Sequence, residues 1–187
     1  MPNLRVVLLA SGSGSLAQAI FEANLEVEFL ALISDKQSLA LSRAEKFGIP
    51  AIHLPVTGNR SDWNRELVAL VSKLNPDLVI SVGFMKILPP EFVNKFKTIN
   101  THPALLPNFP GAHAVADALA AKATVTGSTV HWVDEGVDTG KVIIQEPVAI
   151  LADDGEESLH ERIKIVERRL IVETLKNLIS NGIPEHI

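Results

Sequence analysis

The residues with the clearest potential for chemistry are Asn100 and His102, which stand two positions apart in the segment Thr-Ile-Asn-Thr-His-Pro at residues 98–103. The segment begins as a β-prone run, and an extended backbone sends alternate side chains to the same side. Pro103, Pro107 and Pro110 exclude a helix beyond it, because each lacks an N–H group and fixes φ. An amide and an imidazole at a strand end can donate hydrogen bonds and transfer a proton. This segment alone is equally consistent with a capped strand end.

A carboxylate that could assist His102 is Asp138, in the loop at residues 134–141 between two β-prone runs. If those runs lie beside the strand that carries His102, the loop can meet the end of that strand. A carboxylate there would raise the pKa of the imidazole and fix its orientation. Loop aspartates are also common turn formers, so a purely structural role stays open for Asp138.

A glycine-rich loop, Ser-Gly-Ser-Gly-Ser at residues 11–15, separates the first apolar run from a helical pattern. Backbone N–H groups and a helix N-terminus would converge there, which suits a phosphate group. Ala17 occupies the position of the third glycine of the dinucleotide fingerprint, which disfavours a nicotinamide cofactor. The alternative is a tight turn that merely requires glycine.

Two further candidates are the segment at residues 81–88 and Glu167. The segment follows a predicted strand near the point where open α/β sheets bind ligands, and Gly83 would let a ligand approach the backbone. For Phe84, Ile87 and Leu88, each taken by itself, core packing is the favoured interpretation. Glu167 lies on the apolar stripe of the last predicted helix, where a carboxylate is costly without partners. It could pair with Arg162 or Arg168, or bind a hydroxylated ligand.

The remaining histidines show no spacing typical of metal ligands. His131 lies on a β-prone run that could face the same site as His102. The others are predicted to be ordinary surface or loop residues, namely His53, His113, His160 and His186.

Hydrophobic periodicity predicts an alternation of strands and helices. Strands are expected at residues 5–11, 27–33, 51–54, 78–82 and 97–101, and helices at residues 15–23, 38–47, 61–74, 89–95 and 112–121. The runs at 124–133 and 142–148 are joined too closely for a crossover helix, so they should pair antiparallel, before a final helix at 156–180. The predicted fold is a single-domain α/β, Rossmann-like open sheet of about seven mostly parallel strands, with an antiparallel edge hairpin and helices on both faces.

The composition narrows the class of protein. A chain of 187 residues with 47% hydrophobic content suits one compact domain. The absence of cysteine excludes disulfides, thiolate metal sites and cysteine nucleophiles, and a net charge of −5 without a basic run disfavours nucleic acid. The N-terminal apolar run is too short for a signal peptide, and no stretch approaches the roughly 20 apolar residues of a membrane helix. We therefore expect a cytoplasmic protein with no membrane or nucleic-acid partner.

Four motifs occur together: Gly-Phe-Met-Lys-Ile-Leu at 83–88, Asn-Thr-His-Pro-Ala-Leu-Leu-Pro at 100–107, Gly-Ser-Thr-Val-His at 127–131 and Asp-Thr-Gly at 138–140. With them the chain resembles, over nearly its whole length, the glycinamide ribonucleotide formyltransferases, a folate-dependent formyltransferase family. The resemblance implies a one-carbon transferase of purine biosynthesis. It also implies a phosphate- and nucleotide-binding half at residues 1–100 and a folate-binding, catalytic half at residues 101–187.

The resemblance assigns catalysis to Asn100, His102 and Asp138. It implies a ribonucleotide site of Gly12, Ser13, Gly14, Ser15, Leu16, Gly83, Pro103 with the loop to residue 107, and Glu167. It implies a folate site of Arg60, Met85, Lys86, Ile87, Leu88, Asn100 and the loop that begins at Asp134.

Two residues depart from the family pattern. Leu16 stands where an asparagine commonly contacts phosphate, so phosphate binding must rest on backbone N–H groups and the serines. Lys86 stands where arginine is frequent, which keeps the charge but loses the planar donor fork.

The implied reaction moves the formyl group of 10-formyltetrahydrofolate, a co-substrate, to the amine of 5-phosphoribosylglycinamide in de novo purine (IMP) biosynthesis, without a metal. Direct attack by the amine gives a tetrahedral oxyanion, to which Asn100 and a protonated His102 donate hydrogen bonds, while Asp138 keeps the imidazole charged. The expected partners are these two small molecules, and the chain is a monomer or homodimer.

Four alternatives remain at this stage. A 10-formyltetrahydrofolate hydrolase or a formyltransferase acting on initiator tRNA would share the same three catalytic residues. The hydrolase usually has an extra N-terminal domain and the tRNA enzyme an extra C-terminal one, so both are disfavoured for a chain of this length. A nicotinamide-dependent oxidoreductase is opposed by Ala17, and a non-catalytic nucleotide-binding module leaves the Asn100, His102 and Asp138 set unexplained.

Overall fold

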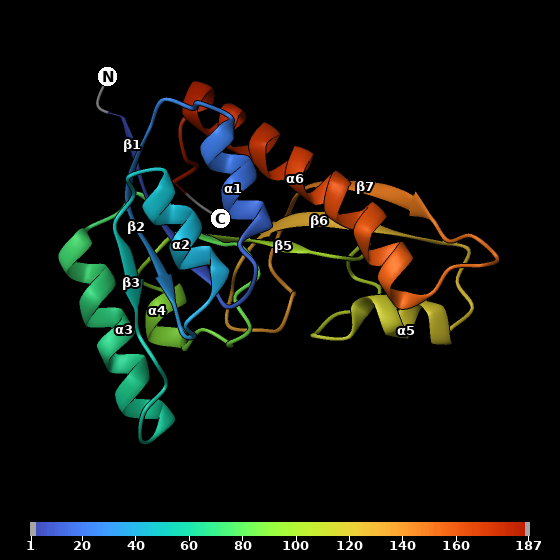
Figure 1. Ribbon diagram of the computed structural model, residues 1–187, viewed down its shortest axis with the longest axis horizontal. Coiled ribbons are helices and arrows are strands. Elements are labelled where there is room, and N and C mark those ends of the chain that lie inside the picture. Colours follow the sequence, from blue (N-terminus) through green and yellow to red (C-terminus); the bar gives the residue numbers. More distant parts are fainter. Residues whose placement is uncertain (1–2, 186–187) are drawn as a thin grey trace. The chain divides into compact units, whose positions relative to one another are not determined.

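The computed structural model describes residues 3–185, which form a seven-stranded mixed sheet in the order β3-β2-β1-β4-β5-β6-β7 (Figure 1). The predicted α/β class, strand number and antiparallel edge hairpin are confirmed. The chain divides into two compact units, Met1–Ile99 and Asn100–Ile187. The boundary falls within β5 (Thr98–His102), the strand that carries Asn100 and His102.

The first unit alternates strands and helices as the periodicity predicts. Its elements are β1 (Leu4–Ala10), α1 (Ser15–Glu22), β2 (Val27–Ser34), α2 (Leu39–Lys46), β3 (Ala51–His53), α3 (Arg60–Leu74), β4 (Leu78–Ser81) and α4 (Pro90–Val93). β1 pairs in parallel with β2 and β4, and β2 pairs in parallel with β3. The carboxyl ends of these strands therefore meet at one edge of the sheet, where open α/β sheets bind ligands.

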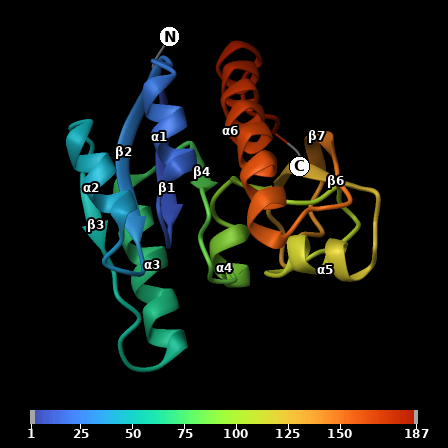
Figure 2. The same cartoon turned by 45° about the vertical axis from the view of Figure 1, so that its right-hand side comes forward.

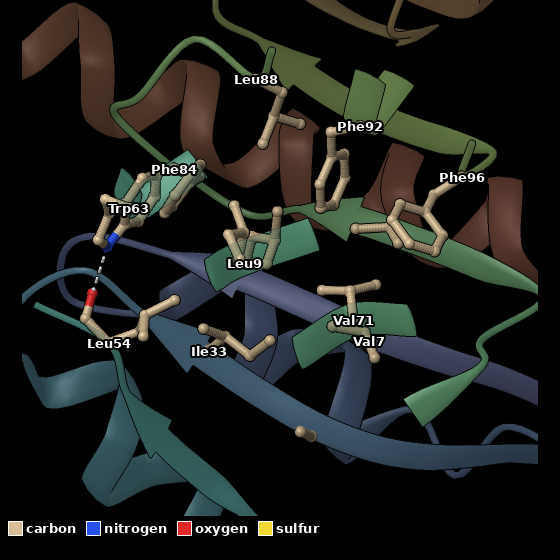
Figure 3. Packing of buried hydrophobic residues seen from close by; sticks show 13 residues of the cluster. Val7, Leu9, Ile33, Leu54, Trp63, Val71, Phe84, Leu88, Phe92 and Phe96 are labelled. Atoms are coloured by element: carbon tan, nitrogen blue, oxygen red, sulfur yellow. Dashed lines mark hydrogen bonds between the residues drawn. The ribbon is translucent and has the colours of Figure 1, made fainter. Parts of the chain in front are cut away.

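The core of the first unit fills one face of its strands. Val7 and Leu9 of β1 point to this face, since alternate residues of a strand share a side, and they belong to one buried cluster with Trp63 of α3 and Phe92 of α4 (Figure 3). The indole N–H of Trp63 donates a hydrogen bond of 3.0 Å to the backbone carbonyl of Leu54. This core fixes α3 against the strands, and Arg60 is the first residue of that helix.

The second unit contains α5 (Ala114–Ala120), β6 (Val125–Trp132), β7 (Val142–Ala149) and α6 (Glu156–Asn181). β6 and β7 pair antiparallel, with an irregularity in register between Val130 and His131. The long helix α6 packs against both strands, and α5 packs near its first turns (Figure 2). Val115 of α5 and Leu159 and Ile163 of α6 form a buried cluster.

Within residues 3–185, none of the helices combines the length and apolar character that crossing a bilayer requires. The same residues contain no group of three or more potential metal ligands.

Candidate active site

The second unit brings together the three residues that the sequence singled out for catalysis. The Nδ1 atom of His102 lies 3.3 Å from Oδ2 of Asp138, and Oδ1 of the same carboxylate lies 3.4 Å from Nε2 of His131. The amide nitrogen of Asn100 lies 3.4 Å from that Nε2 atom. One carboxylate thus stands between two imidazoles, and His131 links it to Asn100.

The structure fixes which nitrogens of the two imidazoles carry protons. His102 Nε2 lies 2.7 Å from the backbone carbonyl of Phe109, and His131 Nδ1 lies 2.8 Å from that of Trp132. A carbonyl oxygen can only accept a hydrogen bond, so each of these nitrogens must donate. His102 therefore has an Nε2–H donor, and only its charged ring also presents an Nδ1–H to the Asp138 carboxylate.

Asp138 raises the pKa of His102, as predicted, but the net shift of that pKa is downward. Burial lowers the pKa of His102, and this outweighs the raising effects of Asp138 and of the hydrogen bond to Phe109. Only 3% of the residue is exposed, so an imidazolium there loses most of its hydration. The sequence indicates the carboxylate but gives no measure of the burial that opposes it.

Asp138 itself is held ionised by its surroundings. Burial pushes its pKa upward, but hydrogen bonds from His131 and from the backbone N–H of Gly111, with the charges of the two histidines, lower it below its ordinary value. The Gly111 N–H lies 2.8 Å from Oδ2. Asp138 adopts a left-handed backbone with φ of 54°, which aspartate tolerates better than most residues. Asp138 therefore both forms the turn and belongs to the candidate site.

His131 is the residue of this cluster to which the sequence assigned no role. Its sequence signals were its place on a β-prone run that could face the site and its position at the end of the motif Gly-Ser-Thr-Val-His. The remaining described histidines lie outside the cluster: His53 and His113 are exposed, and His160 of α6 is half-buried. His186 lies outside the described residues.

The proline-rich loop after β5 is anchored to β6 and β7. The hydroxyl of Thr129 donates to the carbonyl of Ala104 at 2.7 Å and accepts from the N–H of Leu106 at 3.2 Å. Gln145 of β7 donates to the carbonyl of Leu106. These contacts hold the segment from Pro103 onward and so position Phe109, whose carbonyl meets His102.

Asp134 organises the loop that carries Asp138. Its Oδ1 atom accepts hydrogen bonds from the N–H of Gly136 at 3.0 Å and from the hydroxyl of Thr139 at 2.7 Å. The side chain of Asp134 is exposed at this turn. A structural role in the turn is therefore observed, and the predicted contact with folate stays a prediction.

Glu167 is buried in the second unit, with only 5% of the residue exposed. The predicted pairing with a neighbouring arginine does not occur: Arg162 pairs with Asp154, and Arg168 donates to the carbonyl of Lys164. Burial raises the pKa of Glu167 to about 7, and the nearby charges of Lys164 and Arg168 oppose this. A buried carboxylate without an ion pair in the described chain is typical of a functional site.

In the first unit, the glycine-rich loop is tied to the segment that follows β4. The backbone N–H of Ser11 donates to the carbonyl of Gly83 at 3.1 Å, and the Ser11 hydroxyl accepts from the N–H of Met85 at 2.8 Å. Two segments that the sequence predicted separately as ligand-binding are thus joined. Leu16 is only 8% exposed, so its side chain belongs to the core, while its N–H lies in the first turn of α1.

The fold requires glycine at one of the two glycine positions of the loop but not at the other. At Gly14, φ is 72° and a Cβ atom would lie 2.7 Å from Cα of Ala40, whereas at Gly12 nothing lies within 4 Å of such an atom. The turn-forming interpretation therefore holds for Gly14. Space is open beside Gly12, which is exposed.

Gly14→Ala is expected to destabilise the protein by roughly 3 kcal/mol, since a left-handed alanine and a backbone clash add together. Gly12→Ala is the matched control and should change the free energy of unfolding by less than about 1 kcal/mol. Urea unfolding of both variants measures the difference. Equal stabilities would contradict the packing of Gly14 on Ala40.

The segment after β4 alternates between the core and the surface. Phe84 and Leu88 are buried, whereas Met85 and Ile87 are 62% and 68% exposed. The core interpretation thus holds for Phe84 and Leu88 and is wrong for Ile87, which with Met85 presents apolar surface beside Lys86. Arg60 of α3 donates to the carbonyl of Ile87 at 2.7 Å, which ties this predicted folate residue to the segment.

A buried carboxylate lies beside this segment. Asp35 follows β2, only 1% of its side chain is exposed, and its Oδ2 atom lies 3.2 Å from Nζ of Lys86. Neither oxygen of Asp35 has a partner with hydrogen-bond geometry in the described chain. Lys86 is therefore its ion-pair partner. The Lys86 ammonium compensates the charge of the Asp35 carboxylate, although the two groups are not aligned for a hydrogen bond. Asp35 was not identified from the sequence, because no motif connects it to position 86.

Lys86→Met is expected to destabilise the protein by about 3 kcal/mol, because it leaves a buried carboxylate without a counter-charge. The double variant Asp35→Asn with Lys86→Met should recover most of this loss, since it removes both charges. A urea-unfolding cycle over the four proteins measures the coupling. A Lys86→Met protein as stable as the unaltered one would show that Asp35 does not depend on Lys86.

Comparisons of the sequence and of the structure with known proteins agree on one family. A family model described as Formyl transferase matches residues 4–175. The chain is 45% identical to a phosphoribosylglycinamide formyltransferase of Mycobacterium tuberculosis, over 96% of this chain and 86% of that protein. It is 40% identical to the crystal structure of phosphoribosylglycinamide formyltransferase from Streptococcus pneumoniae TIGR4, with a TM-score of 0.85 over 94% of this chain and 98% of the other.

A further solved structure, glycinamide ribonucleotide transformylase 1 from Symbiobacterium toebii, matches with a TM-score of 0.92 and 32% identity, over 98% of this chain and 92% of the other. The similarity in sequence and in structure thus extends over most of each protein. The chain belongs to the formyl transferase family, and within it to the phosphoribosylglycinamide formyltransferases.

Proposed function

We propose that the protein transfers the formyl group of 10-formyltetrahydrofolate to the amine of 5-phosphoribosylglycinamide through a tetrahedral intermediate, with Asn100, His102 and Asp138 as its catalytic residues. The observation that carries the proposal is the network in the second unit in which the Asp138 carboxylate lies between His102 and His131, and Asn100 lies beside His131. It supplies hydrogen-bond donors and a proton carrier, and the reaction needs no protein nucleophile.

The two donors would act on the oxyanion. The amine nitrogen bonds to the formyl carbon, and the formyl oxygen takes up negative charge that Asn100 Nδ2–H and His102 Nε2–H stabilise. The bond from carbon to the folate nitrogen then breaks, and the proton that the amine loses ends on that nitrogen. His102 can carry this proton in its charged form: Nε2 gives its proton to the departing folate nitrogen, and the neutral ring then takes up at Nε2 the proton that the amine loses.

This proposal requires the oxyanion to replace the Phe109 carbonyl on His102. Their 2.7 Å contact occupies the Nε2–H that the reaction uses. The developing oxyanion is a charged acceptor, so it forms the stronger hydrogen bond. Its negative charge also opposes the burial that lowers the pKa of His102.

The ribonucleotide would be bound by the glycine-rich loop and by Glu167. Backbone N–H groups at the start of α1 suit the phosphate, and Ser13 and Ser15 add hydroxyl donors. A buried carboxylate suits the hydroxyl groups of a ribose, because hydrogen bonds from them favour its ionised form. Gly12, Gly14, the backbone of Leu16, Gly83 and Pro103 complete the proposed set.

The folate would contact the exposed apolar side chains Met85 and Ile87 and the cations beside them. Arg60 and Lys86 suit its glutamate carboxylates, while Leu88, Asn100 and the Asp134 turn complete the proposed set. We further propose that the enzyme acts in the cytoplasm on these two small molecules, with residues 1–100 binding phosphate and residues 101–187 supplying the catalytic groups His102 and Asp138. No metal takes part in the proposed reaction.

The decisive experiment incubates the protein with 10-formyltetrahydrofolate in the presence and absence of 5-phosphoribosylglycinamide and follows the release of tetrahydrofolate. Release that depends on the ribonucleotide, with formylated ribonucleotide as the product, is the expected result. Release of formate without the ribonucleotide would instead indicate a 10-formyltetrahydrofolate hydrolase. No release under either condition would overturn the proposed function.

A further inference from the structure

We propose that Asp35 is a specificity-determining residue for the anionic part of the folate: by binding the Lys86 ammonium it leaves Arg60 as the cation that recognises the glutamate carboxylates. This inference rests on the proposed function, because it assigns a role within the proposed folate site. It concerns a residue that neither the sequence motifs nor the catalytic group include.

The three charged side chains gather around one short segment of the first unit. Lys86 belongs to the segment, and its Nζ atom lies 3.2 Å from Asp35 Oδ2. Arg60 donates to the carbonyl of Ile87, the next residue along. The negative charge of Asp35 also acts on Arg60, where it raises the pKa against the lowering effect of burial.

The two cations differ in how far their charges are neutralised. Lys86 faces a carboxylate whose side chain is almost completely buried, and a buried charge interacts strongly because water screens it little. Arg60 has no ion pair within the described chain, and its guanidinium carbon lies 4.5 Å from the centroid of the Trp63 ring. Stacking on an aromatic ring fixes a guanidinium and leaves its edge free for a carboxylate.

Two cations and one carboxylate give this group a single net positive charge. The glutamate carboxylates are the anionic groups of a formyl-folate, and every added glutamate brings one more. A group with one net positive charge gains little from additional carboxylates. Asp35 therefore limits how strongly the protein prefers folates with longer glutamate tails.

Asp35→Asn tests the inference, because it removes the negative charge and keeps the shape of the side chain. The measurement is the ratio of KM for 10-formyltetrahydrofolate with one glutamate to KM for the form with three glutamates. The variant should raise this ratio about threefold at low salt, the effect of one partly exposed ion pair. The increase should disappear at high salt, and kcat should stay unchanged.

Two further variants test whether the net charge of this group, and not the charge of the whole protein, determines the KM ratio. The double variant Asp35→Asn with Lys86→Met restores the single net charge and should return the KM ratio to that of the unaltered protein. Glu45→Gln is the matched control, because it removes one negative charge from an exposed position on α2 in the same unit. It should leave the ratio unchanged.

The possible outcomes are distinct. A ratio that does not change in Asp35→Asn, or an equal increase in both KM values, would overturn the inference and assign Asp35 a structural role. Formyl transfer by the unaltered protein with no change in the ratio would overturn this inference alone. Absence of formyl transfer in the unaltered protein would overturn the proposed function and this inference with it.

Discussion

Replacing His102 with alanine is expected to lower kcat for formyl transfer by about three orders of magnitude. The variant loses both the Nε2–H donor to the oxyanion and the group that carries the proton. Each contribution is worth roughly two orders of magnitude, and the two losses overlap because one side chain makes both contributions. KM should change much less, because the lost interactions strengthen only in the transition state. Steady-state kinetics with both substrates provides the measurement.

The matched control for this variant is His113→Ala, which removes an exposed histidine of the same unit. It should retain the turnover of the unaltered protein. Circular dichroism and urea unfolding establish that the His102 variant is folded. Turnover within tenfold of the unaltered protein in a folded His102→Ala variant would exclude the proposed catalytic role.

Asp138→Asn removes the negative charge beside His102 and keeps the shape of the side chain. Asp138 raises the pKa of His102 against the larger lowering effect of burial, so removing its charge should lower that pKa further. Imidazole titration followed by NMR should therefore show His102 titrating below its ordinary value of 6.5 in the unaltered protein, and at still lower pH in the variant. A higher pKa in the variant would contradict this electrostatic assignment.

Glu167→Gln is expected to stabilise the protein by about 3 kcal/mol at pH 8, because each unit of pKa shift corresponds to about 1.4 kcal/mol. Burial raises the pKa of Glu167 from 4.5 to about 7. Between these two values the folded protein retains a proton that the unfolded chain has released. The stability of the protein therefore falls as pH rises through this window, and the destabilisation caused by the ionised Glu167 is fully present above pH 7.

Urea unfolding between pH 4.5 and pH 8 measures this effect. The variant and the unaltered protein should have similar stability at the acid end and diverge as pH rises. Glu161→Gln is the matched control, since Glu161 is exposed on the same helix and its pKa is lowered by Lys164. It should leave the pH dependence in this window unchanged. A stability difference at Glu167 that does not grow with pH would contradict a raised pKa.

The same substitution should weaken ribonucleotide binding if Glu167 contacts the ribose. The expected result is a higher KM for 5-phosphoribosylglycinamide with no change in KM for the folate. A more stable protein that binds its substrate less well would identify Glu167 as a carboxylate retained for binding at a cost in stability.

The sequence predicts the fold well because its strands and helices differ clearly in hydrophobic period. The apolar runs at residues 5–11 and 78–82 correspond to β1 and β4, and the closely joined runs after residue 124 form the antiparallel pair β6 and β7. These patterns are local, and the topology of an α/β sheet follows from their order. Boundaries differ from the predictions by only a few residues.

The candidate site is predicted less completely, because its properties depend on contacts between distant residues. The spacing of Asn100 and His102 indicates a site, but the link through His131 arises only when β6 is placed beside the loop of Asp138. The net pKa shift of His102 depends on burial, which a motif does not encode. The pairing of Asp35 with Lys86 likewise joins the end of β2 to the segment after β4.

The contact between His102 and the carbonyl of Phe109 has a consequence for selectivity between ground state and transition state. In the proposed reaction, the formyl oxygen of the bound co-substrate replaces the Phe109 carbonyl oxygen as the acceptor of the His102 Nε2–H. Both oxygens are neutral, so the exchange adds little to the affinity for the co-substrate in the ground state. The charged oxygen of the intermediate gains more from the same exchange. An internal competitor for the donor thereby directs its contribution to kcat, and analogues with a tetrahedral, negatively charged oxygen should benefit most from it.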